Sequence, residues 1–173
     1  MKKFILIFSI VFISCSRRAE FGNFKESYFK FDKVDRYFLN ISDDSLSLMQ
    51  DKEKLSENDK ILIDLMLYNN PESISDKNFI SNLEKIKLTK TEIDSEKYDE
   101  LSQIFSEKRG ATEITDACKP SYRNILIFKD DGKVTGIAKL CFNCQRYYII
   151  GTNKDIESFG KSGEFKKLEK LIK

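Results

Sequence analysis

The stretch that decides the fold is residues 118–151, CKPSYRNILIFKDDGKVTGIAKLCFNCQRYYIIG. Two apolar runs, Asn124–Lys129 and Lys133–Phe142, flank Asp130-Asp131-Gly132, with the turn expected at Asp131-Gly132. Asp-Gly between apolar runs indicates a tight β-hairpin, because both central residues of its turn need positive φ. The sequence therefore predicts two antiparallel strands that meet at this turn.

The two-residue turn also predicts the register of the hairpin. It places Ile125 opposite Ala138 and Ile127 opposite Gly136. Because Gly136 and Ala138 are small, we expect a helix to pack closely over their face of the sheet. The same alternation turns five residues of the second strand toward one core, namely Val134, Gly136, Ala138, Leu140 and Phe142.

Further strands are expected beside the hairpin. Tyr147–Ile150 is typical of a third strand, and Glu164–Ile172 has the apolar stripe of a C-terminal helix. Alternating residues near 33–41 predict another strand, and residues 87–93 predict an edge strand. The sequence thus predicts an α+β fold, in which an antiparallel sheet centred on the strands of residues 124–150 is packed by several helices, one of them C-terminal.

The middle of the chain is expected to be mainly helical. Polar residues that can cap a helix precede apolar runs at several points, and Asp59 lies three residues after Ser56, as in a capping box. The expected helices are a short one with Leu46, Met49 and Leu55, one over 57–69 capped by Ser56, one capped by Ser75, and one from Asp94 to a C-cap at Gly110.

Three cysteines, Cys118, Cys141 and Cys144, are expected to converge at one end of the sheet. In an oxidising compartment a structural disulfide is the usual outcome, and a bridge from Cys118 to Cys144 or Cys141 would stabilise the fold by roughly 3 kcal/mol. A redox dithiol is a second interpretation, although a thioredoxin-like Cys-x-x-Cys opens a helix and here a strand follows. A metal site is the third, with a carboxylate such as Asp116 as fourth ligand.

Few other residues are candidates for a catalytic or binding role. The chain has no histidine, which excludes Ser-His-Asp and Cys-His catalysis and most catalytic zinc sites. No catalytic residue and no cofactor are predicted. Arg123 is a candidate contact for an anion, with an ion pair to a nearby carboxylate as the alternative.

The N-terminus reads as an export signal. Met1-Lys2-Lys3 is followed by ten apolar residues at 4–13, too few to span a bilayer as a helix. We therefore predict a signal peptide over residues 1–14. Its removal takes away two lysines and leaves 28 basic residues against 28 acidic ones, a balance that argues against a nucleic-acid partner.

The end of this leader, Phe12-Ile13-Ser14-Cys15, resembles the lipobox of bacterial lipoproteins, in which a small residue precedes an acylated cysteine. Phe12 departs from the leucine usual in that motif. The resemblance implies cleavage before Cys15, lipidation of Cys15 with fatty acids such as palmitate, and membrane attachment through several acyl chains. Ordinary secretory cleavage near Ser16 is the alternative. The expected location is the bacterial cell envelope, at the outer membrane, facing the periplasm or the cell exterior.

The lipidated cysteine is expected to lie close to the folded part of the chain. Aromatic residues begin at Phe21, and such residues tend to become buried. We therefore predict a short tether over residues 15–20 and a single globular domain over residues 21–173.

The body of the chain carries a second resemblance. The pattern C-x4-R-x4-F, D-G-K and C-F-x-C, from Cys118 to Cys144, is similar to a segment of small, uncharacterised envelope lipoproteins of Gram-negative bacteria. It implies a location and no mechanism. The first hypothesis for function is a non-enzymatic binding or interaction lipoprotein with an unknown protein partner, of which an immunity-type protein is one variant. The alternative is a thiol-based redox or metal-binding envelope protein that uses Cys118, Cys141 and Cys144.

Overall fold

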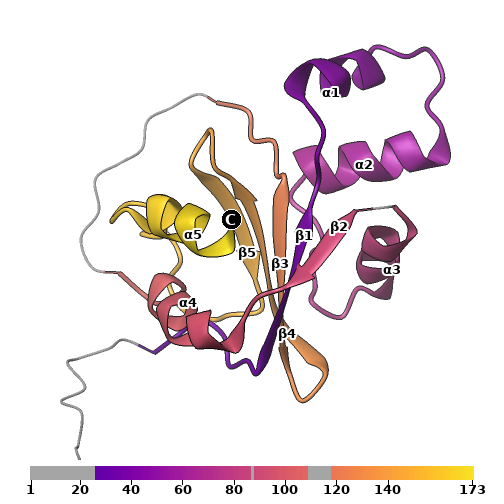
Figure 1. The fold of residues 1–173 in the computed structure, drawn as a ribbon. Coiled ribbons are helices and arrows are strands. Elements are labelled where there is room, and N and C mark those ends of the chain that lie inside the picture. The colour runs from indigo at the N-terminus through magenta and orange to yellow at the C-terminus, as the bar shows by residue number, and fades with distance from the viewer. Residues whose placement is uncertain (1–25, 87, 109–117) are drawn as a thin grey trace, which may run out of the picture.

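The computed structural model describes residues 26–86, 88–108 and 118–173. They form a five-stranded antiparallel sheet in the order β2-β1-β3-β4-β5 with helices on both faces (Figure 1), which confirms the predicted α+β fold. The strands are β1 (Lys33–Phe38), β2 (Thr89–Glu92), β3 (Asn124–Asp130), β4 (Lys133–Cys141) and β5 (Arg146–Ile150). The helices are α1 (Asp43–Gln50), α2 (Glu57–Leu67), α3 (Lys77–Lys85), α4 (Tyr98–Ile104) and α5 (Glu164–Ile172).

Some predictions concern residues that the structure does not describe and are therefore not tested by it. The signal peptide, Cys15, the tether over residues 15–20 and Asp116 lie outside the described residues. Within the described ranges, no helix combines the length and apolar character needed to cross a bilayer.

The β3–β4 hairpin has the predicted turn. Asp131 and Gly132 both have positive φ, 49° and 72°, as a two-residue hairpin turn requires. Lys129 pairs with Val134 beside the turn, but Phe128 pairs with Gly136, because a β-bulge separates the two pairs.

This bulge makes the predicted register wrong by one residue. Ile125 lies opposite Lys139 and Ile127 opposite Ile137, each one residue beyond its predicted partner. The physical reason is the extra residue, Thr135, which the partner strand does not match. The predicted row of inward residues is therefore split, since Val134 packs on the opposite face from Gly136, Ala138, Leu140 and Phe142.

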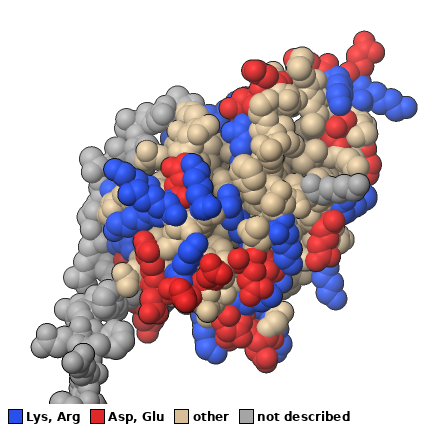
Figure 2. All heavy atoms as spheres, viewed as in Figure 1, with Lys and Arg blue, Asp and Glu red and all other residues tan. Residues whose placement is uncertain are grey.

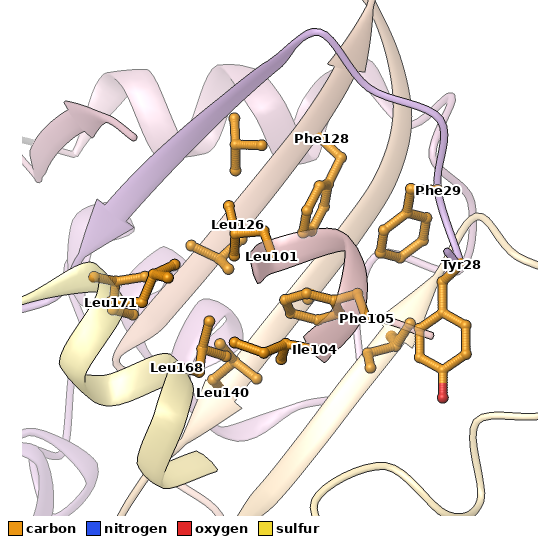
Figure 3. Packing of buried hydrophobic residues seen from close by; sticks show 14 of the residues in the cluster. Tyr28, Phe29, Leu101, Ile104, Phe105, Leu126, Phe128, Leu140, Leu168 and Leu171 are labelled. Carbon is orange, nitrogen blue, oxygen red and sulfur yellow. The ribbon is translucent and has the colours of Figure 1, made fainter. Parts of the chain in front are cut away.

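One face of the sheet is covered by α4 and α5. Leu101 of α4 and Leu168 of α5 pack against Leu126 and Phe128 of β3 (Figure 3). The ring of Phe29 occupies the space over Gly136 where a Cβ would lie. The small residues thus admit an aromatic ring from the segment before β1, where we expected a helix.

The other face is covered by α1, α2 and α3. Ile125 and Ile127 pack there with Met66 of α2 and Leu83 of α3, all 1% exposed or less. Burial of one such side chain stabilises the fold by about 1.5–3 kcal/mol. α1 ends at Gln50, so the predicted Leu55 follows the helix instead of belonging to it.

Helix caps explain where α2 and α3 begin. Ser56 caps α2 with Asp59 in a reciprocal capping box, as predicted. For α3 the predicted cap, Ser75, is wrong by one residue: Asp76 accepts hydrogen bonds from the backbone N–H groups of Asn78 and Phe79. A carboxylate at this position also complements the positive end of the helix dipole.

α4 is shorter than predicted. It follows a 3₁₀ turn, η1 (Ser95–Lys97), and ends at Ile104, six residues before the expected cap at Gly110, which lies outside the described residues. Ser106 instead forms an isolated bridge with Ser27. The residues after Ile104 thus pair with the segment around Ser27 and do not continue α4 by another turn.

An ion-pair cluster around one buried carboxylate joins the strands at the β2 edge. The carboxylate of Asp35 is 2% exposed and lies 2.7 Å from Lys129 Nζ and 3.1 Å from Lys90 Nζ. Burial alone would raise the pKa of Asp35, but the hydrogen bonds from the two lysines outweigh burial and lower it. Asp35 therefore stays ionised inside the fold.

Candidate functional site

The three predicted cysteines do converge at one end of the sheet. Cys118 and Cys144 form a disulfide with a Cα–Cα distance of 5.8 Å. Cys141, the last residue of β4, is a free thiol and is buried, with 3% exposure. Cys141 and Cys144 pack in one cluster with Tyr122, which precedes β3. The structure therefore contains the predicted disulfide, with Cys144 as the partner of Cys118.

This arrangement limits the chemistry of the Cys-x-x-Cys motif. Cys144 is bonded to Cys118, and the motif runs from the last residue of β4 into the turn before β5, so among the described elements no helix begins at either cysteine to favour the thiolate. Within the described ranges, no group of three or more His, Cys, Asp or Glu side chains is placed to hold a metal ion. Of the three cysteines, Cys141 alone keeps a thiol that could react, and this thiol is buried.

A buried lysine lies beneath the cysteine cluster. Lys139 of β4 is fully buried and donates hydrogen bonds to Tyr68 O (2.6 Å) and Asn70 Oδ1 (2.7 Å). Its Nζ also lies 5.1 Å from the centre of the Tyr122 ring, a cation–π distance. Burial lowers the pKa of Lys139 to about 7, and the nearby charge of Asp64 opposes that shift.

The same network fixes the turn after α2. Tyr122 donates its hydroxyl hydrogen to Asn69 Oδ1 (2.9 Å), and Tyr148 of β5 donates to Pro71 O (2.9 Å). Burial raises the pKa of Tyr122 to about 12, so it remains a donor over the physiological range. Lys139 and these tyrosines therefore hold α2 against the sheet, which is a structural role.

Arg123 forms the ion pair that we gave as the alternative to an anion contact. Its Nε donates to Ile41 O (2.7 Å), and its Nη2 lies 2.6 Å from Asp43 Oδ1 at the start of α1. The Asp43 side chain is 69% exposed, so the pair adds little stability. Arg123 is nevertheless placed at the edge of a pocket.

This pocket, which we call the end pocket, lies where the C-terminal ends of β1, β4 and α5 meet the start of β3, and has a volume of about 470 Å³. Both Cys141 and Arg123 line it, so two of the residues singled out in the sequence share one cavity. Its lining combines cationic, amide and apolar side chains, namely Arg36, Phe38, Ser121, Arg123, Asn124, Cys141, Phe142, Asn143, Glu169, Ile172 and Lys173.

Arg36 of β1 is the most firmly held cation of the end pocket. Its Nε and Nη2 donate to Asn124 Oδ1 (3.1 and 2.8 Å), and its Nη1 donates to Ile172 O (2.6 Å) at the end of α5. A cation at this end complements the helix dipole. Burial lowers the pKa of Arg36, but an arginine stays charged in proteins.

Ser121 adds an unpaired hydroxyl to the same wall. Its Oγ is buried and has no hydrogen-bond partner among the described residues. Most buried polar atoms are paired, so this hydroxyl keeps a donor that no group of the described residues uses, on a residue that lines the cavity.

Sequence reasoning missed Arg36, Ser121 and Lys139. Arg36 lies in the alternating segment near residues 33–41, which predicts a strand but no pocket, because the pocket also needs residues of α5 that are distant in the sequence. Lys139 lies in an apolar strand, where a single lysine among Ile137, Ala138 and Leu140 was a signal of a buried cation.

Comparisons of the chain with models of protein families, with curated proteins and with solved structures gave no match.

Proposed function

We propose that the protein is a lipid-anchored protein of the bacterial cell envelope that binds a ligand or partner group and catalyses no reaction. The leader ending at Cys15 supports the location and the membrane anchor. The end pocket supports the binding role, because it brings residues from four separate elements around one cavity.

The observation that carries the binding role is the chemistry of the cations in the end pocket. Arg36 and Arg123 are guanidinium groups fixed by hydrogen bonds to the protein itself. A guanidinium keeps its charge and is not deprotonated at physiological pH. Such groups recognise and orient an anion and are poor general acids or bases, which favours binding over catalysis.

The binding role is tested by native mass spectrometry of the full-length protein, extracted from its own membranes in mild detergent. We expect a non-covalently bound mass on the wild-type protein and its loss in Arg36→Gln. The Lys166→Gln variant removes an exposed lysine of α5 outside the pocket and should keep that mass. Wild-type protein that carries no bound mass, from a small molecule or from a protein partner such as the target of an immunity-type protein, would contradict the role.

The anchor is tested by Cys15→Ala. The wild-type protein should be in the membrane fraction with the mass of its acyl chains. The Cys15→Ala protein should lack that mass and leave the membranes on washing. Equal membrane retention of the two proteins would refute anchoring through Cys15.

A thiol-based function is the second candidate, because the free Cys141 thiol lies in the same cluster as the Cys118–Cys144 disulfide. Intact-mass analysis with an alkylating agent, before and after reduction, distinguishes the two functions. The binding role predicts a stable disulfide that resists mild reductants. Rapid exchange among the three cysteines in the folded protein, or metal retained by reduced protein, would favour the thiol-based function.

A further inference from the structure

We propose that the end pocket binds an organic anion, with a carboxylate or phosphate group held by Arg36 and Arg123 and an apolar body held by Phe38 and Phe142. The inference rests on the proposed binding function and names the class of ligand. The hydrogen bonds, burial and charge of the pocket residues support this inference.

The two arginines keep hydrogen-bond donors for a ligand. A guanidinium has five N–H groups. Hydrogen bonds to the protein use three on Arg36 and two on Arg123. Two N–H groups on Arg36 and three on Arg123 therefore have no partner among the described residues. Arg36 takes part in none of the ion pairs that the described residues form. Planar guanidinium groups suit the paired oxygens of a carboxylate or a phosphate.

The hydroxyl of Ser121 gives a third donor at the same cavity. Its Oγ is buried without a partner in the described part of the chain, and it lines the pocket with both arginines. An oxygen of the bound anion would accept a hydrogen bond from it. Asn124 is 5% exposed and its Oδ1 is held by Arg36, which fixes the arginine before the ligand arrives.

The rest of the lining is suited to an apolar group. Phe38 and Phe142 are half-buried, and Ile172 of α5 is 6% exposed. A cavity of about 470 Å³ lies within the range of roughly 300–1,000 Å³ typical of small-molecule sites. A bare inorganic ion would leave most of this volume and the apolar wall without contacts.

The charges around the end pocket favour an anion. Glu169 lines the pocket but pairs with Lys173 at 2.6 Å, so its charge is compensated. Lysines outnumber acidic residues over residues 164–173, where Lys166, Lys167, Lys170 and Lys173 stand against Glu164 and Glu169, and Figure 2 shows basic side chains over α5 with acidic ones beside them. The C-terminal end of this helix borders the cavity. A surface of this sign raises the local concentration of anions near the site.

The proposal is tested by isothermal titration calorimetry on the full-length protein in a non-ionic detergent, with detergent alone as the blank. The probes are 3-phenylpropanoate, phenyl phosphate, inorganic phosphate and the neutral 3-phenylpropanol. We expect saturable binding of one or both aromatic anions and no saturable binding of the alcohol. The preferred anion shows whether the ligand is an organic acid or a phosphate ester.

Substitutions of pocket residues test whether the probe binds in the end pocket. Because a hydrogen bond to a charged group is worth about 1.5–3 kcal/mol, Arg36→Gln should raise the Kd by about 10- to 100-fold. Ser121→Ala should raise it by a smaller factor, and Lys166→Gln should change it less than about twofold. Arg36 also holds the end of α5, so Arg123→Gln is a second test should Arg36→Gln unfold.

Three results would overturn the proposal: no binding of either aromatic anion, equal binding of the alcohol, or equal affinity in the arginine variants and Lys166→Gln. A neutral ligand found bound to the native protein would also overturn it and would leave the proposed binding function intact. If neither a native ligand nor a probe binds, both fail.

Discussion

The buried Lys139 predicts that the protein becomes more stable as the pH rises above 7. Burial lowers the pKa of Lys139 to about 7 in the folded protein, whereas the lysine has a pKa of about 10.4 in the unfolded chain. Between these values the unfolded chain binds more protons than the folded one. The free energy of unfolding therefore increases with pH in this window.

The size of the effect follows from the proton linkage. Each pH unit inside the window contributes about 1.4 kcal/mol when the folded lysine is neutral and the unfolded one is charged. From pH 7.5 to pH 9 we expect an increase of about 2 kcal/mol. The tyrosines titrate at higher pH, because burial raises the pKa of Tyr122 to about 12 and also raises that of Tyr147.

The assay is urea unfolding between pH 7.5 and 9, followed by circular dichroism, for wild type and Lys139→Met. The Cys141→Ala substitution is made in each protein, because a free thiol would attack the disulfide at alkaline pH. Lys133→Met removes an exposed lysine of the same strand and should keep the increase, whereas Lys139→Met should lose it. An unchanged slope in Lys139→Met would refute the assignment to this lysine.

Three further predictions concern single features of the fold. Because the pKa of Asp35 is lowered in the folded protein, its contribution to stability is complete above about pH 4 and is lost as the pH falls below it; Asp35→Asn should flatten this loss in acid unfolding curves. Gly136→Ala should lower the free energy of unfolding by about 1–3 kcal/mol, because the new methyl group would overlap the Phe29 ring, and urea titration measures it. Cys141 should react with iodoacetamide only in denaturant, because it is 3% exposed; intact mass would show otherwise if the native protein were labelled.

Most of the strands of the sheet could be predicted from the sequence. Turn chemistry located the Asp131-Gly132 hairpin, and alternation located β1 near residues 33–41. The capping box at Ser56 located the start of α2. These signals are local, so the residues that specify each feature lie within a few positions of one another.

The features that sequence reasoning missed depend on contacts between distant segments. The β-bulge at Thr135 has no local signal in the sequence, and it shifts the pairing by one residue, so that Ala138 shares a face with Leu126 and not with Ile125. The early end of α4 follows from the bridge between Ser27 and Ser106, which are far apart in the chain. Arg36 and Ser121 reach one cavity only because α5 returns to the end of the sheet.

The disulfide also determines how the protein would respond to a mechanical load. Cys118 and Cys144 are 26 residues apart, and the bond between them encloses the whole β3–β4 hairpin. Force applied to the two ends of the chain passes through the two sulfur atoms and bypasses this hairpin. At about 3.5 Å per residue, and with the bridged Cα atoms 5.8 Å apart, the fully stretched oxidised chain is shorter than the reduced chain by about 85 Å. β3 and β4 would therefore remain joined by a closed loop after every other element has been pulled apart.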